Sequence, residues 1–159
     1  MNSDINHANR AHAILSASGS KRWLNCPRSA LFSLEFPPSL TSKFAEEGTA
    51  AHELAEHILK GLPAHKKMDA EMLSHVKVYT DYVLERSKDK SLAIEEKGDL
   101  LWINAELSKG TSDAIIRGYW DIEIVDLKYG AGVPVSPVEN TQLMMYALMA
   151  IYDKKRNVS

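Results

Sequence analysis

Apolar side chains recur at helical spacing in the first half of this chain. From about residue 45 to 60 they fall every three or four positions, and the same spacing returns from about residue 69 to 87. This periodicity places the apolar side chains on one face of an α-helix, so both segments are predicted to be helices. Gly61 and Pro63 follow the first segment, and this order of residues is typical of a helix end.

Two shorter helices are expected nearer the N-terminus. Ser16 and Ser18 are suitable N-caps for a helix that runs towards Leu24, because a serine hydroxyl can accept a hydrogen bond from a free backbone N–H group. A second helix is expected over residues 28–34. The pair Pro37-Pro38 then interrupts the pattern, since proline lacks the N–H group that a helix interior needs.

The pattern changes after about residue 90, where short segments rich in Ile, Val, Leu or Trp replace the helical spacing. Turn-like residues separate these segments, which predicts a meander of short strands. The expected strands are 92–97, 100–104, 112–117 and 122–127, with breaks at 97–99, 108–110 and 118–119. A mostly apolar segment, residues 141–152, is predicted to form a helix that packs against the sheet. This order of elements indicates an α/β fold.

The length of 159 residues suits one domain with a real core. We expect that domain to span residues 13–152, after a flexible segment at 1–12 and before a tail at 153–159. Apolar residues make up 45% and charged residues 25%, as in ordinary globular chains. The net charge of -2 provides no global positive field for nucleic acid. It leaves a nuclease possible, because metal-binding carboxylates subtract charge and basic groups need line only one groove.

The chain has a single cysteine, Cys26, which excludes an internal disulfide framework and a cysteine-based zinc site. We expect Cys26 to be a small buried side chain. The sequence contains no apolar run of about 18 residues that would predict a membrane span. Its first ten residues are polar, unlike a signal peptide. These features favour the cytoplasm and no membrane association.

Candidate chemistry centres on the run Asp126-Leu127-Lys128. Residues two apart on a strand point to the same face, so Asp126 and Lys128 would lie side by side. The carboxylate could then hold a metal while the ammonium sits next to it, a combination that suits metal-assisted hydrolysis of a phosphodiester. Such a run is common by chance, and solvated charges at a strand end are the alternative interpretation.

Four motifs follow one another in an informative order. They are Gly48-Thr49-Ala50-Ala51-His52, Gly110-Thr111-Ser112-Asp113, Asp126-Leu127-Lys128 and Gln142 to Tyr146. This series resembles the RecB-like branch of the PD-(D/E)XK nuclease superfamily. Ser16-Ala17-Ser18, followed by residues 23–28, resembles the opening helix of that branch. Residues 12–152 as a whole resemble a phage and prophage family of RecB-like proteins. The resemblance implies a restriction-endonuclease-like core, with a mixed or antiparallel central sheet flanked by helices.

The resemblance implies a role for each matching residue. His52 matches a helix-borne histidine that ligates the metal, and Asp113 matches the first strand carboxylate, usually a direct ligand. Asp126 matches the second carboxylate, and the main-chain carbonyl of Leu127 adds an oxygen ligand. Lys128 matches the lysine that helps to deprotonate or orient the attacking water and stabilises the phosphate. Asp113, Asp126 and Lys128 are therefore the expected catalytic residues, and His52, Asp113 and Asp126 are expected to converge on one ion.

Gln142 and Tyr146 lie four residues apart, on one face of the last predicted helix. They match the helix that closes the site and contacts substrate, with the tyrosine ring as a stacking surface for an unpaired base. Leu143 and Ala147 would then face the core. Ordinary helix-surface positions are the alternative for both polar residues. Glu95 is interpreted mainly as a strand-edge charge, with approach to the metal as the alternative, because neighbouring strands share a face.

The expected ligand set points to Mg²⁺ or Mn²⁺. Carboxylates and a carbonyl suit a hard divalent cation, and an imidazole shifts the preference towards Mn²⁺. Iron–sulfur members of the branch need four cysteines, so no cluster is expected in a chain with Cys26 alone. The related phage proteins are longer than this chain, which indicates a truncated protein or a fragment.

The sequence therefore predicts a divalent-metal-dependent DNA nuclease, exonuclease-like, that acts in phage or prophage DNA metabolism in the cytoplasm of the bacterial host. DNA is the expected partner, together with phage recombination or replication proteins. One alternative is a catalytically inactive relative that binds DNA or another protein. The other is a structural or assembly protein of a phage in which the motifs are vestigial.

Overall fold

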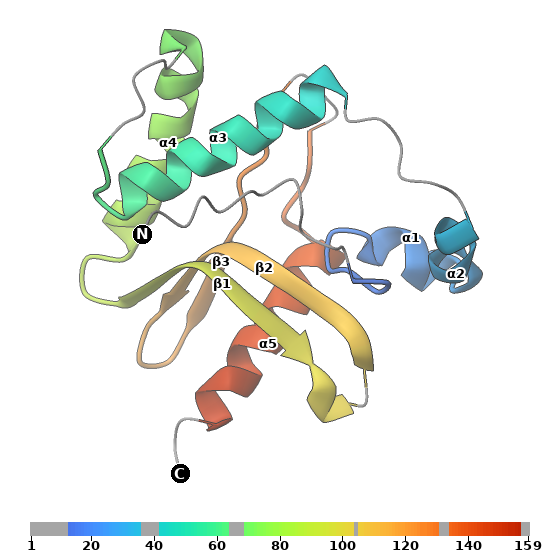
Figure 1. Cartoon of the computed structure of the whole chain (residues 1–159). Helices are drawn as coiled ribbons and strands as arrows, with labels where there is room; N and C mark the ends of the chain where they lie inside the picture. The colour runs from blue at the N-terminus through green and yellow to red at the C-terminus, as the bar shows by residue number, and fades with distance from the viewer. Residues whose placement is uncertain (1–12, 36–41, 64–68, 104, 131–133, 157–159) are drawn as a thin grey trace, which may run out of the picture.

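The computed structural model describes residues 13–35, 42–63, 69–103, 105–130 and 134–156 (Figure 1). The elements are α1 (Ser20–Asn25), α2 (Arg28–Phe32), α3 (Lys43–Leu59), α4 (Ala70–Arg86), β1 (Ser91–Leu100), β2 (Ala105–Arg117), β3 (Ile122–Val125) and α5 (Thr141–Arg156). Short 3-10 turns, Ser33–Glu35 and Leu101–Ile103, follow α2 and β1. The expected flexible segment at 1–12 and the proline pair at 37–38 lie outside the described residues.

The three strands form an antiparallel meander in the order β1-β2-β3. β1 pairs with most of β2, whereas β3 pairs only with residues 114–117. Figure 1 shows α3 and α4 together on one side of this sheet and α5 running across the other. The contacts agree, because Ile124 packs in the α5 cluster while its neighbour Val125 packs against the α4 side. The predicted α/β fold, with an antiparallel sheet flanked by helices, is confirmed.

The long helices begin at side chains that satisfy their free N–H groups. Ser42 accepts a hydrogen bond from the Ala45 N–H at 3.2 Å, and Asp69 accepts one from the Glu71 N–H at the same distance. Both helices therefore lie within two residues of their expected bounds. α5 continues to Arg156, so the first part of the expected tail at 153–159 is helical instead.

The start of the chain differs from the expectation. α1 begins at Ser20, and the Ser16 hydroxyl accepts a hydrogen bond from the Gly19 N–H at 3.2 Å, which forms a turn before the helix rather than its N-cap. Cys26 lies between α1 and α2 and is exposed, because the two helices leave it uncovered. The prediction that it is buried was wrong.

Two of the predicted strand breaks were also wrong. Residues 97–99 lie inside β1 and residues 108–110 lie inside β2, so these are two long strands. In place of the expected strand at 100–104, Leu100 ends β1 and Leu101–Ile103 form a 3-10 turn, while residue 104 lies outside the described residues. The break at 118–119 is confirmed as the turn between β2 and β3.

The physical reason for the error is a pair of glycines that look like turn residues. Gly98 and Gly110 lie directly opposite one another in the sheet. A Cβ on Gly98 would lie 2.7 Å from the Met149 Cβ, and one on Gly110 would lie 2.7 Å from a ring carbon of Tyr146. Both glycines therefore allow the close approach of α5 to the strands, the main use of glycine inside a strand.

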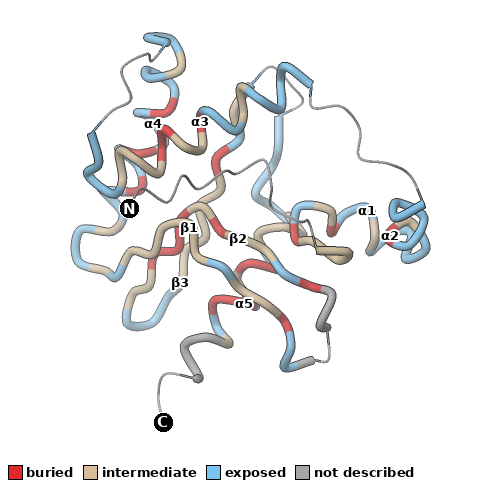
Figure 2. The backbone as a smooth tube through the Cα atoms, viewed as in Figure 1, coloured by how far each residue is buried: buried red, intermediate tan, exposed pale blue. Residues whose placement is uncertain are grey.

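Buried residues gather where α3, α4 and α5 meet the sheet (Figure 2). Ala51, Leu54 and Ala55 of α3 pack against Val76 of α4 and Leu127. On the other side of the sheet, the buried residues of α5 are Met145, Tyr146, Met149 and Ala150, whereas Leu143 and Ala147 are only half-buried. Within the described segments, no helix has the length and apolar character that crossing a bilayer requires.

Candidate functional site

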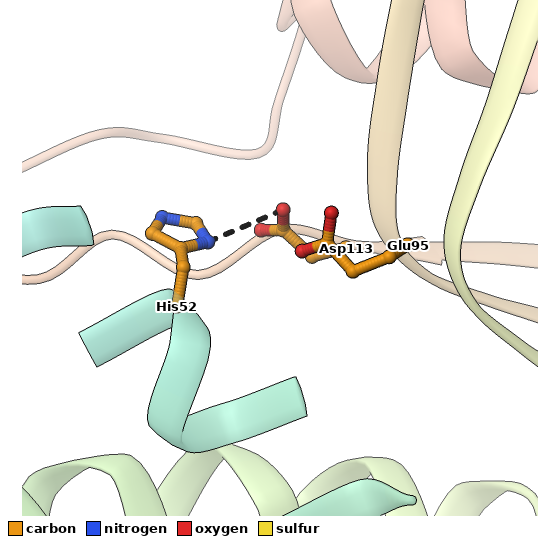
Figure 3. Close-up of side chains that lie close together, drawn as sticks. All are labelled: His52, Glu95 and Asp113. Carbon is orange, nitrogen blue, oxygen red and sulfur yellow. Dashed lines mark ion pairs between the residues drawn. The ribbon is translucent and has the colours of Figure 1, made fainter. Parts of the chain in front are cut away.

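Three ligand-type side chains from three elements converge between α3 and the sheet. His52 of α3, Glu95 of β1 and Asp113 of β2 each offer one ligand atom, and these atoms all lie within 4.8 Å of one another. His52 Nδ1 lies 3.3 Å from Asp113 Oδ1. Figure 3 shows the imidazole pointing from its helix towards the two carboxylates. One ion with ligand distances of roughly 2.0 to 2.3 Å fits such a group after small side-chain rotations.

Glu95 has an unusual backbone conformation. Its φ is 54°, in the left-handed region that residues other than glycine rarely adopt. The pairs on either side of it, Ile94 with Ala114 and Glu96 with Ser112, keep one register, so Glu95 lies opposite Asp113. Such a conformation costs roughly 1–3 kcal/mol, and residues of this kind cluster at functional sites. The strain therefore marks Glu95 as a residue of the site.

His52 is held beside the carboxylates by the packing of α3. Its neighbour Ala51 is fully buried against α4, which orients the helix towards the sheet. Burial by itself would lower the pKa of His52, but the hydrogen bond and charge of Asp113, with the charges of Asp126 and Glu95, outweigh it and raise the pKa. The imidazole thus lies in an excess of negative charge, which a bound cation would balance.

Asp113 links β2 to the segment that follows β3. Its Oδ2 accepts a hydrogen bond from the Leu127 N–H at 2.7 Å, while Oδ1 faces His52. A backbone donor on one oxygen fixes the carboxylate and leaves the other oxygen directed at the cluster. Leu127 thus contacts the site through its N–H group. Metal ligation by its main-chain carbonyl stays a prediction.

Asp126 lies immediately after β3 and has both oxygens engaged. Gln142 Nε2 donates to Oδ1 at 2.8 Å, and Lys128 forms an ion pair with Oδ2. Its side chain is only 7% exposed, and burial raises its pKa, as does the charge of Asp113, against the opposing effect of Lys128. The Lys128 side chain is 47% exposed, so its ammonium lies at the border between this carboxylate and solvent.

The convergence predicted for His52, Asp113 and Asp126 is therefore present in part. His52 and Asp113 meet as expected. The third member of the close group is Glu95, whereas Asp126 lies next to it, near enough to influence the pKa of His52. The sequence indicated Glu95 only as a carboxylate on the strand next to that of Asp113. No pattern indicated the left-handed backbone conformation that directs its side chain towards His52 and Asp113. Direct ligation by Asp126 stays a prediction.

Gln142 joins Asp126 to Tyr146. Its amide nitrogen also lies 3.3 Å from the Tyr146 hydroxyl. The tyrosine is only 6% exposed and packs with Ala17, Leu100 and core methionines of α5. Burial raises its pKa to about 12. The ring packs between α5 and the strands and leaves little surface for stacking, and the predicted substrate contacts by Gln142 and Tyr146 stay predictions.

Tyr79 of α4 is a functional candidate that the sequence showed only as part of an apolar stripe. It lines a small recess with His52, Glu95 and Asp113. Its hydroxyl is buried and has no hydrogen-bond partner among the described residues. Burial raises its pKa, and the charges of Asp113, Asp126 and Glu95 raise it further. A buried hydroxyl without a partner is costly, so this group is a donor ready for a water or a substrate oxygen in the site.

The donor set fits a divalent cation with mixed preferences. One imidazole nitrogen and the carboxylates of Glu95 and Asp113 combine the ligands that suit Mg²⁺ with one that favours Mn²⁺. The excess negative charge and the unpartnered Tyr79 hydroxyl both agree with a site completed by an ion and its water.

Comparison with known proteins gives a family and no fold relative. No solved structure matches the chain. The sequence model of a family described as "Protein of unknown function (DUF2800)" matches residues 12–156, which is most of the chain. The chain therefore belongs to the DUF2800 family.

Proposed function

We propose that this protein is a divalent-metal-dependent DNA nuclease of the PD-(D/E)XK superfamily, from its RecB-like branch. The observation that carries the proposal is the convergence of His52, Glu95 and Asp113, with Asp126 and Lys128 beside them. A metal-binding group next to a lysine is an arrangement that suits phosphodiester hydrolysis, because the metal can activate a water and the lysine can stabilise negative charge on the phosphate. The order of the motifs along the chain supports the same class of enzyme.

The residues divide the work as follows. A bound Mg²⁺ or Mn²⁺ would supply an acidified water and neutralise charge on the phosphate. His52, Glu95, Asp113 and Asp126 would hold that ion between α3 and the sheet. Lys128 places a positive charge beside Asp126, where it stabilises the negative charge that develops on the phosphate oxygens. Tyr79 donates a hydrogen bond from its free hydroxyl to an oxygen in the site.

The finer parts of the proposal come from the RecB-like resemblance. It implies a restriction-endonuclease-like core, attack from DNA ends, and a role in phage or prophage DNA metabolism in the bacterial cytoplasm. The alternative is a relative without activity that binds DNA or a partner protein. The buried, unpartnered Tyr79 hydroxyl and the strained Glu95 favour the enzyme, because a binding protein has no need to retain either cost.

The direct test is cleavage of labelled DNA by purified protein with Mn²⁺, Mg²⁺ or EDTA. We expect cleavage with either metal, none in EDTA, and faster cleavage of linear than of covalently closed circular duplex. Asp126→Asn, purified in the same way, keeps an acceptor for Gln142 but should weaken Mn²⁺ binding and cleavage together. Asp81→Asn on the exposed surface of α4 is the matched control. Equal activity of wild type and Asp126→Asn would mean a contaminating nuclease and reject the proposal.

A further inference from the structure

A second feature of the molecule is a cleft of about 510 Å³ beside the part of the β1–β2 hairpin where β1 ends and β2 begins. Two lysines, Lys97 and Lys109, line it, together with the hydroxyl residues Ser16, Ser18 and Thr111. We propose that this cleft binds a phosphate group of the nucleic-acid strand next to the phosphate that is cleaved. The inference rests on the proposed function and assigns the substrate path of the same site.

The register of the sheet places the cleft next to the metal-binding group. Lys97 lies opposite Thr111, and Asp99 lies opposite Lys109, so these four side chains share one face of the hairpin. Thr111 is two residues before Asp113 on β2, which is about 7 Å along a strand and on the same face. A phosphate in the cleft would therefore be a neighbour of one at Asp113 along the same nucleic-acid strand.

The charge of the cleft suits an anion. Neither Lys97 nor Lys109 forms an ion pair with a carboxylate among the described residues. The acid in the lining, Asp99, already accepts a hydrogen bond from the Leu101 N–H at 3.1 Å. Lysine side chains bind phosphate as point charges, and hydroxyl groups complete such contacts by donating hydrogen bonds. The cleft is thus a local positive site in a chain whose net charge is -2.

The serine side of the cleft is held in place. The Ser16 hydroxyl accepts from the Gly19 N–H and lies 3.5 Å from the Ser18 hydroxyl, which donates to it. The Ser16 main-chain carbonyl accepts a hydrogen bond from the Trp23 indole N–H at 2.9 Å. With these acceptor positions used, the Ser16 hydroxyl proton is the part that remains to donate. The segment before α1 therefore presents a fixed donor, although the sequence suggested only a helix cap.

The test measures DNA binding without cleavage, in Ca²⁺, with fluorescein-labelled single-stranded oligonucleotides. Lys97→Gln/Lys109→Gln is compared with Lys77→Gln/Lys88→Gln, which removes the same charge from α4 and the turn that follows it. We expect the cleft variant to weaken binding at least about tenfold at low salt. The slope of log Kd against log salt should fall by about 1.4, since each lysine–phosphate contact on a single strand contributes about 0.7. The control variant should leave the slope near that of wild type.

Oligonucleotides with a 5′-phosphate and with a 5′-hydroxyl separate the two sources of the phosphate. An equal loss on both indicates an internal phosphodiester, and a loss on the phosphorylated strand alone indicates a terminal phosphate; either supports the cleft. An unchanged Kd and slope in the cleft variant overturns the inference even if wild type cleaves DNA. Lysine-dependent binding without cleavage in Mn²⁺ would instead reject the nuclease and retain the cleft.

Discussion

The Leu127 N–H donates to Asp113 Oδ2 at 2.7 Å, which ties the central strand to the segment that carries Asp126 and Lys128. The Asp113 carboxylate therefore has two roles, because one oxygen faces His52 while the other holds the segment after β3 in place. Asn at this position can still accept from Leu127, whereas Ala cannot.

Substitutions at Asp113 should therefore separate the two roles. Asp113→Asn should remove most Mn²⁺ affinity but keep the thermal stability of the metal-free protein close to that of wild type. Asp113→Ala should lose metal affinity and also destabilise the fold by about 1–3 kcal/mol, since a backbone N–H loses its partner. Titration calorimetry with Mn²⁺ and urea unfolding in EDTA check both effects. Equal stability of the two variants would contradict the anchoring role.

Glu95 should strengthen metal binding while its strained backbone lowers the stability of the metal-free protein. Its φ of 54° suits glycine far better than alanine, so metal-free Glu95→Gly should be more stable than Glu95→Ala by about 1 kcal/mol. Both variants should bind Mn²⁺ at least about tenfold more weakly than wild type, a loss of about 1.4 kcal/mol. Urea unfolding in EDTA measures the first difference and calorimetry the second. If Glu95→Ala is the more stable variant, the strain assigned to this backbone is absent.

The sequence predicted the helices well because amphipathic spacing and caps are local properties. The residue pairs that form the site depend on tertiary structure. Gly98 and Gly110 resemble turn residues until the position of α5 explains them. Tyr146 resembles an exposed substrate-binding residue until the core around it is known. The φ of Glu95 is a property of the β1–β2 pair, so no single segment could indicate it.

The motif spacing predicted the identity of several site residues more successfully than their contacts. His52 and Asp113 meet because the first long helix and the central strand carry them to one place. The hydrogen bond from the Gln142 amide to Asp126 forms because the first turn of α5 lies beside the end of β3, which a helical face alone does not specify. The sequence could not single out Tyr79, because only the packing shows that its hydroxyl is buried without a partner among the described residues.

Lys128 should act on the reaction rather than on the ion. Lys128→Ala should leave Mn²⁺ affinity within a few-fold of wild type and reduce cleavage about 100-fold or more, typical of the loss of a positioned electrostatic group. Lys43→Ala, at a highly exposed ion pair of α3, is the control for loss of a lysine. Single-turnover cleavage in saturating Mn²⁺ gives the rate. A Lys128→Ala rate equal to that of wild type would remove this lysine from the mechanism.

Tyr79 and Tyr82 form a matched pair on α4. Tyr79→Phe removes a buried hydroxyl without a partner, so the metal-free protein should be as stable as wild type or more stable by about 1 kcal/mol. Tyr82→Phe removes a hydroxyl that donates to Glu123 at 2.6 Å and should not gain stability. Cleavage should fall in Tyr79→Phe alone. Destabilisation by Tyr79→Phe, or loss of cleavage in both variants, would reject the donor role of Tyr79.

The pH dependence of stability should reveal the excess negative charge at the site. The folded pKa of His52 is raised, so its stabilising contribution is complete below the ordinary pKa of about 6.5 and is lost as pH rises through the folded value. The raised pKa of Asp126 acts with the same sign at lower pH. Stability from these groups therefore declines as pH rises, whereas Mn²⁺ binding needs the imidazole unprotonated and strengthens over the same range.

We expect the rise in melting temperature on replacing EDTA with Mn²⁺ to be larger at pH 8 than at pH 6. In His52→Gln this difference between the two pH values should shrink. A rise that is equal at both pH values in wild type would show that His52 does not ligate the ion.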